Sequence, residues 1–161
     1  MFVVMGGTCH IDSELTKNLL LSRRDVTVVT RSGKRAENLV KLGAQLAEID
    51  SSDHRSLNKV LKQASGVHIL NPPANPVHDV DVEERRTIAA ITRALENTNL
   101  KKVIVQSTYS AQEGDHIGDL GSLYLLEVKV KEIYPEALIV RAAFICPIGI
   151  LHLMGLPKKD V

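Results

Sequence analysis

Aromatic residues are scarce in this chain of 161 residues, with two Phe, three Tyr and no Trp. Proteins that bind single-stranded nucleic acid stack bases on aromatic side chains, and most nucleic-acid binders present a basic face. The formal net charge here is +1, and no cluster of Lys and Arg is interleaved with aromatic residues. The composition therefore argues against a nucleic-acid partner.

Cysteine is scarce, and long apolar runs and metal-ligand spacings are missing. The two cysteines, Cys9 and Cys146, give no disulfide framework, so we expect a reducing, cytoplasmic setting. The first apolar run is too short for a signal peptide, and residues 148–156 are too few to span a membrane. The short apolar runs lead us to expect no membrane association. The six histidines show no ligand spacing, so we expect no metal.

What the sequence does contain is a regular alternation of two patterns. Short β-branched runs predict strands at residues 2–5, 26–30, 45–49, 67–70, 102–106 and 137–142, and amphipathic segments predict helices between them. Such alternation is typical of a parallel sheet with right-handed crossovers. We therefore predict an α/β fold, a Rossmann-like doubly wound parallel sheet of about six strands in the order 3-2-1-4-5-6, with helices on both faces.

Two helix starts carry capping signals. Ser52 or Asp53 is expected to cap the helix that follows the third strand. The long helix from about residue 80 opens with acidic residues, which suit the positive end of the helix dipole. These acidic residues are Asp79, Asp81, Glu83 and Glu84.

The first strand meets the pair Gly6-Gly7, and a helix pattern follows at once. Strand, glycine turn and helix open the dinucleotide-binding βαβ unit, in which backbone N–H groups face a pyrophosphate. The spacing Gly6-x-x-Cys9-x-x-Asp12 keeps glycine at only the first of three fingerprint positions. Cys9 would stand where phosphate oxygens approach, and Asp12 would add a negative charge in the first helical turn. Like charges about 5 Å apart cost on the order of 3 kcal/mol at an effective dielectric of about 20, so we expect weakened binding.

Cys9 allows two interpretations. A thiol at a helix N-terminus can serve as a redox sensor. The alternative is a small residue that simply fills the turn.

Six segments then occur in the order found in a known family. They are GGTCHID (6–12), VTVVTRS (26–32), LAEIDSSDHRSL (46–57), ILNPPA (69–74), VIVQSTYSA (103–111) and ALIVRAAFICP (137–147). With these segments, residues 1–147 resemble the NmrA-like group of atypical short-chain dehydrogenase/reductases. The resemblance implies an NAD(P)-binding Rossmann domain over residues 1–147. It also implies that residues 148–161 are a C-terminal tail, the remnant of a missing substrate-binding portion.

Arg31 follows the second strand, where a carboxylate would bind the ribose of NAD and an arginine accepts the 2′-phosphate of NADP. A solvated basic loop is the alternative, and the resemblance favours NADP(H) over NAD(H). The resemblance also implies adenine contacts after the third strand, contacts to the middle of the cofactor after the fourth, and nicotinamide contacts after the sixth. The predicted cofactor-binding residues are Gly6, Thr8, Cys9, His10, Ile11, Arg31, Ser32, Lys34, Asp50, Ser51, Asn71, Pro72, Pro73, Ser107, Phe144 and Ile145.

The sequence offers two weak catalytic candidates, Ser107 at the end of the fifth strand and Tyr124 in the next helix. Short-chain dehydrogenases pair a Tyr general acid with a Lys four residues later on the same helical face. Position 128 is Val128, so the dyad is absent, and a packing role is the alternative for Tyr124. Hydride transfer to a quinone or a dye needs no strong protein acid.

We therefore expect an NADP(H)-dependent oxidoreductase with weakened cofactor binding and a small-molecule electron acceptor of the quinone or dye type. The alternative is a non-catalytic NADP(H)-sensing protein that regulates a protein partner.

Overall fold

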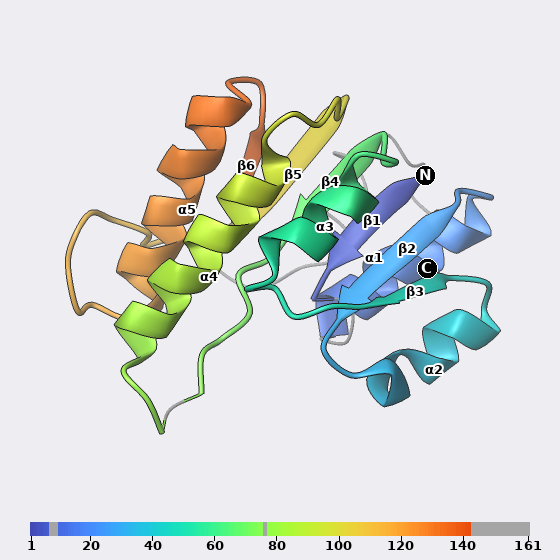
Figure 1. Ribbon diagram of the computed structural model, residues 1–161, viewed down its shortest axis with the longest axis horizontal. Helices are drawn as coiled ribbons and strands as arrows, with labels where there is room; N and C mark the ends of the chain where they lie inside the picture. Colours follow the sequence, from blue (N-terminus) through green and yellow to red (C-terminus); the bar gives the residue numbers. More distant parts are fainter. Residues whose placement is uncertain (7–9, 76, 143–161) are drawn as a thin grey trace.

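The computed structural model describes residues 1–6, 10–75 and 77–142, in which six strands alternate with five helices (Figure 1). The strands are β1 (Phe2–Met5), β2 (Val26–Thr30), β3 (Gln45–Glu48), β4 (Gly66–Ile69), β5 (Lys102–Thr108) and β6 (Leu138–Ala142). The helices are α1 (His10–Leu21), α2 (Gly33–Lys41), α3 (His54–Leu61), α4 (Val80–Leu95) and α5 (Asp119–Ile133).

All strand pairs are parallel, and the sheet order is β3-β2-β1-β4-β5-β6, which confirms the predicted topology. The strand β1 pairs with β2 on one side and with β4 on the other. The chain therefore changes its direction of travel across the sheet between β1 and β4. Loops that leave the sheet at such a point diverge, which opens room for a ligand.

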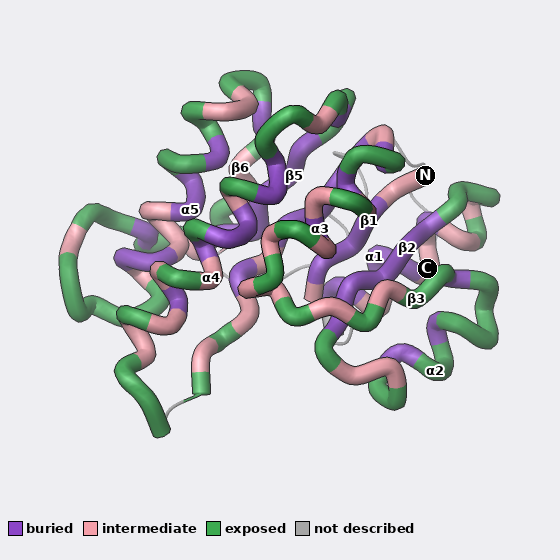
Figure 2. The backbone as a smooth tube through the Cα atoms, in the orientation of Figure 1, coloured by how far each residue is buried: buried purple, intermediate pink, exposed green. Residues whose placement is uncertain are grey.

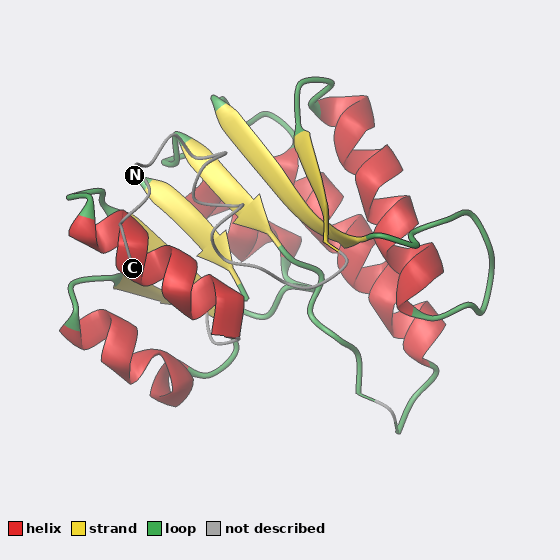
Figure 3. Cartoon of the chain, turned by 180° about the vertical axis from the view of Figure 1, so that it is seen from behind, coloured by secondary structure: helices red, strands yellow, loops and turns green. Residues whose placement is uncertain are grey.

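Helices cover both faces of the sheet, with α3, α4 and α5 on one face and α1 and α2 on the other (Figures 1 and 3). The two faces follow from the alternation of side chains along each strand. In β1, Val3 and Met5 join the core beneath α3, α4 and α5, whereas Val4 joins the core beneath α1 and α2. The central strands are accordingly buried along most of their length (Figure 2).

Local chemistry sets several of the element ends. The carboxylate of Asp53 accepts hydrogen bonds from the backbone N–H groups of Arg55 and Ser56, so Asp53, rather than Ser52, caps α3. Gly43, with φ +105°, follows the end of α2 in the left-handed conformation that is typical of a C′ glycine. The strand β5 runs two residues further than predicted, to Thr108, because β6 pairs with it up to Ala142.

No helix within the described ranges is long and apolar enough to cross a bilayer.

Two leucines test this packing. Leu126 of α5 is fully buried in the core, whereas Leu21 at the end of α1 is 63% exposed. Leu126→Ala should lower the free energy of unfolding by about 2–5 kcal/mol, because it leaves a cavity under α5. Leu21→Ala should change it by less than about 0.5 kcal/mol. Urea unfolding followed by circular dichroism measures both, and equal effects would contradict this core assignment.

Candidate functional site

Two cavities open at the carboxyl ends of the strands, on either side of the loop that follows β4. The β2-side cavity has a volume of about 240 Å³ and is lined by Gly6, Val29, Thr30, Arg31, Ser32, Arg35, Ser51, Leu70, Pro72 and Pro73. The β5-side cavity, of about 430 Å³, is lined by Leu70, Asn71, Pro73, Glu84, Gln106, Thr108, Asp119, Leu120, Ser122, Leu123 and Ala142. They share Leu70 and Pro73, so the two cavities adjoin at the point where the strand order reverses.

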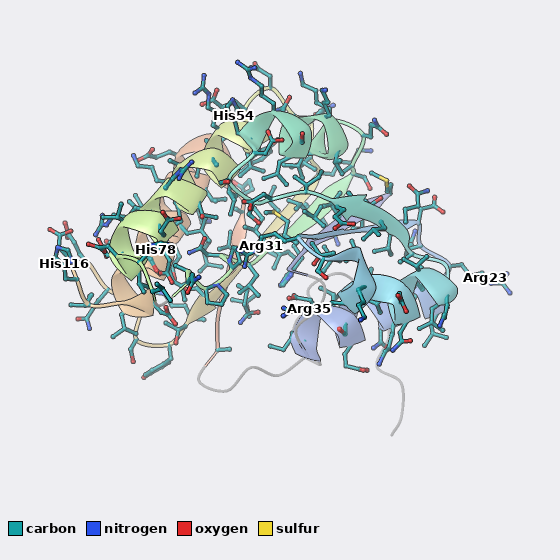
Figure 4. The ribbon with its side chains drawn as sticks, turned by 60° about the horizontal axis from the view of Figure 1, so that its bottom comes forward. Arg23, Arg31, Arg35, His54, His78 and His116 are labelled. Atoms are coloured by element: carbon teal, nitrogen blue, oxygen red, sulfur yellow. The ribbon has the colours of Figure 1, made fainter. Side chains whose placement is uncertain are left out.

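The β2-side cavity is basic. Arg31 directly follows β2, and Arg35 lies in the first turn of α2 with its backbone N–H bonded to the carbonyl of Ser32 (Figure 4). The hydroxyl of Thr30 accepts a hydrogen bond from the Ser32 N–H, which shapes the turn between them. Both arginines line the cavity, whereas the predicted Lys34 does not. Sequence reasoning missed Arg35, although its spacing of four residues from Arg31 was a usable signal.

The loop after β3 brings Ser51 to the same cavity, while the neighbouring Asp50 closes its own turn. The Asp50 carboxylate accepts hydrogen bonds from the Ser52 N–H (2.8 Å) and hydroxyl (2.7 Å). These bonds hold the pKa of Asp50 below its ordinary value, and the positive charges of Arg31 and Arg86 act in the same direction. The Asp50 carboxylate thus stabilises its own loop. The adenine contact predicted for Asp50 stays a prediction.

Gly6 ends β1 with φ +80°, a conformation that L side chains rarely adopt. A Cβ at this position would lie 3.0 Å from Oδ2 of Asp12 and 3.3 Å from Cδ2 of Leu70. The backbone conformation therefore favours glycine here, and a side chain would also make tight contacts with Asp12 and Leu70. Thr8, Cys9, Phe144, Ile145 and the His10 side chain lie outside the described residues.

Asp12 lies in the first turn of α1, as expected, but its side chain is turned into the protein. It is 1% exposed, and its Oδ1 lies 3.2 Å from Nδ1 of His68, a fully buried residue of β4. We expected Asp12 to repel a diphosphate, and that expectation assumed that its carboxylate is an isolated charge on the helix. The structure gives the carboxylate a close neighbour in β4, which the sequence did not reveal.

Buried polar groups line the β5-side cavity, among them Asn71, Gln106 and Glu84. Asn71 follows β4 and Gln106 belongs to β5. The sequence placed Glu84 with the acidic residues that favour the start of α4. The structure instead uses Asp79 as the N-cap, with its carboxylate accepting from the Val82 N–H. Glu84 lies one turn further along and is buried.

The two catalytic candidates are not brought together. Ser107 is buried on β5, and its hydroxyl donates a hydrogen bond to Glu127 of α5. Arg141 of β6 binds the same carboxylate through Nε (2.9 Å) and Nη2 (2.6 Å), and this pairing raises the pKa of Arg141. Tyr124 lines a different cavity, of about 380 Å³, together with Val128. It lies close enough to Arg141 to be among the groups that raise the pKa of that residue.

Sequence reasoning missed Glu127, which belongs to no motif, and Arg141, which lies in the segment 137–147 but was given no role there. Within residues 1–6, 10–75 and 77–142, no group of three His, Cys, Asp or Glu side chains could hold a metal ion.

A parallel sheet of this order, with a glycine turn after β1 and cavities across the strand-order reversal, defines a nucleotide-binding domain of the Rossmann type. A family described as NAD(P)H-binding matches residues 6–135, and the chain belongs to this family. The prediction of an NAD(P)-binding Rossmann protein is thereby confirmed.

Solved structures support the fold. Triphenylmethane reductase from Citrobacter sp. matches 89% of this chain with a TM-score of 0.74 and 18% identity, over 49% of its own length. A nucleoside-diphosphate-sugar epimerase from Staphylococcus aureus matches 87% of this chain with a TM-score of 0.73 and 12% identity, over 49% of its length. The quinone oxidoreductase QOR2 of Escherichia coli, complexed with NADPH, matches 88% of this chain with a TM-score of 0.65 and 16% identity.

The chain thus spans about half the length of these proteins, since QOR2 is covered over 48% of its chain. At such identities the likeness establishes the fold alone. No curated protein matches the sequence.

The pKa of Asp50 makes a pH-dependent prediction. A carboxylate whose pKa is lower in the folded state stabilises the fold above its unfolded-state pKa of about 3.9. This contribution is lost as the pH falls through the lower, folded-state pKa. Asp50→Asn should therefore be less stable than the wild type at pH 7, and the difference should shrink below about pH 4. Thermal unfolding across this range measures it, and a pH-independent difference would exclude the charge as its cause.

Proposed function

We propose that this chain binds NADP(H) across the two adjoining cavities and serves an NmrA-like reductase that uses a small-molecule electron acceptor. The observation that carries the proposal is the continuity of the cavities through Leu70 and Pro73 at the strand-order reversal. One cavity is basic and lies beside β2, and the other is polar and lies beside β5. A dinucleotide with a phosphorylated ribose at one end and a nicotinamide at the other matches this polarity.

The β2-side cavity supports NADP(H) over NAD(H). Arg31 and Arg35 present two guanidinium groups to it, and Ser32 adds a hydroxyl. Guanidinium groups bind phosphate through two parallel N–H donors, which gives strong, charge-assisted hydrogen bonds. The described lining of this cavity includes no carboxylate, and the nearby Asp50 is bonded to Ser52 in its own turn. A residue that would select the free 2′-hydroxyl of NAD is therefore absent from the described lining of this cavity.

NADPH supplies a hydride, and the chain would orient the cofactor relative to the electron acceptor. Two of the similar structures support this reaction class, because they are a triphenylmethane reductase complexed with NADP(H) and a quinone oxidoreductase complexed with NADPH. The position of Tyr124, away from the β5-side cavity, fits an acceptor that needs no proton from a tyrosine.

Charge removal tests the cofactor preference. Arg31→Ala and Arg35→Ala should each weaken NADPH binding about tenfold or more, since a hydrogen bond to a charged group contributes about 1.5–3 kcal/mol. NADH binding should change much less. Arg23→Ala is the matched control, because Arg23 lies before β2, at the opposite end of the strand from Arg31 (Figure 4). Fluorescence titration with both nucleotides measures this, and equal losses for NADPH and NADH would refute the 2′-phosphate assignment.

The altered fingerprint gives a second test. Cys9→Gly with Asp12→Gly should tighten NADPH binding by more than tenfold, because it restores close backbone approach and removes a negative charge. Cys9→Gly alone is measured beside it, since loss of Asp12 leaves His68 without its close neighbour. An unchanged affinity in both variants, with the fold intact by circular dichroism, would sink the proposal of weakened binding.

A nucleotide-sensing regulator without turnover is the second candidate function. It is favoured by Val128 in the place of the dyad lysine and by the hydrogen bond from Ser107 to Glu127. Binding of a partner protein that changes with the ratio of NADPH to NADP, with no NADPH consumption over a panel of quinones and dyes, would support this candidate.

A further inference from the structure

The polar lining of the β5-side cavity consists largely of hydrogen-bond acceptors. Asn71 and Gln106 are 7% and 3% exposed, and neither Oδ1 of Asn71 nor Oε1 of Gln106 has a hydrogen-bond partner among the described residues. The Nε2 of Gln106 donates to the carbonyl of Ser107 at 3.3 Å, so the amide oxygen is the end left without a partner. Because an unpaired buried acceptor costs free energy, a ligand that brings donors would be stabilised here.

The charged groups of this cavity are of one sign. Glu84, only 2% exposed, and Asp119 at the start of α5 both line it. Within the described ranges, neither carboxylate belongs to an ion pair. The nearby cations are engaged elsewhere, with Arg85 bound to Asp81 and Asp115 and Arg141 bound to Glu127.

A buried carboxylate without a cation is unfavourable, and a bound positive charge compensates it. The volume of about 430 Å³ lies in the range of small-molecule sites. We propose that the β5-side cavity binds an organic cation with N–H donors, and that a protonated imine is the substrate class of the reductase. The reaction rests on the proposed function, whereas binding of the cation does not.

Hydride transfer to such a substrate balances without a protein acid. The hydride leaves NADPH and forms a C–H bond at the imine carbon, while the π electrons of the C=N bond move to nitrogen. NADP⁺ and a neutral amine result, and no proton is consumed in the step. A neutral ketone would instead leave an alkoxide that needs a proton. The lining of the β5-side cavity is rich in acceptors and does not include Tyr124, and both observations favour a protonated imine.

Binding is tested first, without any nucleotide. The probes are tetrahydroisoquinoline, a cation with N–H donors at neutral pH, and isochroman, its neutral ether counterpart with the same ring skeleton. Calorimetric titration of the 161-residue chain should show at least tenfold tighter binding of the cation. Glu84→Gln should remove most of this preference and leave isochroman unaffected. Glu83→Gln is the matched control, because it removes the same charge from the adjacent position of α4, outside the cavity lining.

Equal binding of the two probes by the wild type would overturn the inference, as would an unchanged preference in Glu84→Gln. If circular dichroism shows that Glu84→Gln does not fold, Asp119→Asn takes its place and should reduce the preference at least threefold. An unchanged preference in that variant would also count against the site.

Turnover measurements then distinguish a failure of the cation site from a failure of the proposed reductase function. NADPH oxidation is followed with protonated dihydroisoquinoline and with menadione, a neutral quinone. Faster reduction of the imine, lost in Glu84→Gln through a raised KM, supports the substrate class. Reduction of menadione but not of the imine would support the proposed reductase and refute the imine as its substrate class. Selective binding of the cation with reduction of neither acceptor would support the cation site. It would refute both the reductase function and the imine as a substrate.

Discussion

The crowding around Gly6 is the constraint on which the rest of the site depends. Here the end of β1, the first turn of α1 and the residue after β4 meet so closely that a Cβ on Gly6 would lie 3.0 Å from Asp12 and 3.3 Å from Leu70. The left-handed conformation of Gly6 turns the chain as it leaves β1. Leu70 is pressed against this turn and also lines both cavities, so the position of the turn fixes the wall between them.

The fold was predictable because each element carries its own periodic signal. The strand β2, with all five residues buried, reads as a β-branched run, and Asp53 and Gly43 mark helix ends through local backbone chemistry. Such features depend on neighbours within four residues. Parallel pairing and right-handed crossovers then leave few arrangements of six strands, so the order followed.

The site was predictable only where a motif marks it. Gly6, Arg31 and Ser32 lie in segments with a known role in the βαβ unit. Asp12 of α1 and His68 of β4 are far apart in the sequence, and no local pattern predicts that they lie close together. Glu84 was interpreted only as one of the acidic residues that suit the helix dipole, because the sequence does not say which side of α4 faces the strand ends. Ser107, Glu127 and Arg141 likewise come from three elements.

The link between Glu127, Ser107 and Arg141 also bears on how the sheet opens locally. The strand β6 pairs with β5, and its Arg141 reaches a buried carboxylate of α5. Separation of β6 from the sheet would leave Glu127 with the Ser107 hydroxyl alone, which is costly for a buried charge. We therefore expect β6, the end of β5 and α5 to open together, as one cooperative unit, although β6 is only half-buried.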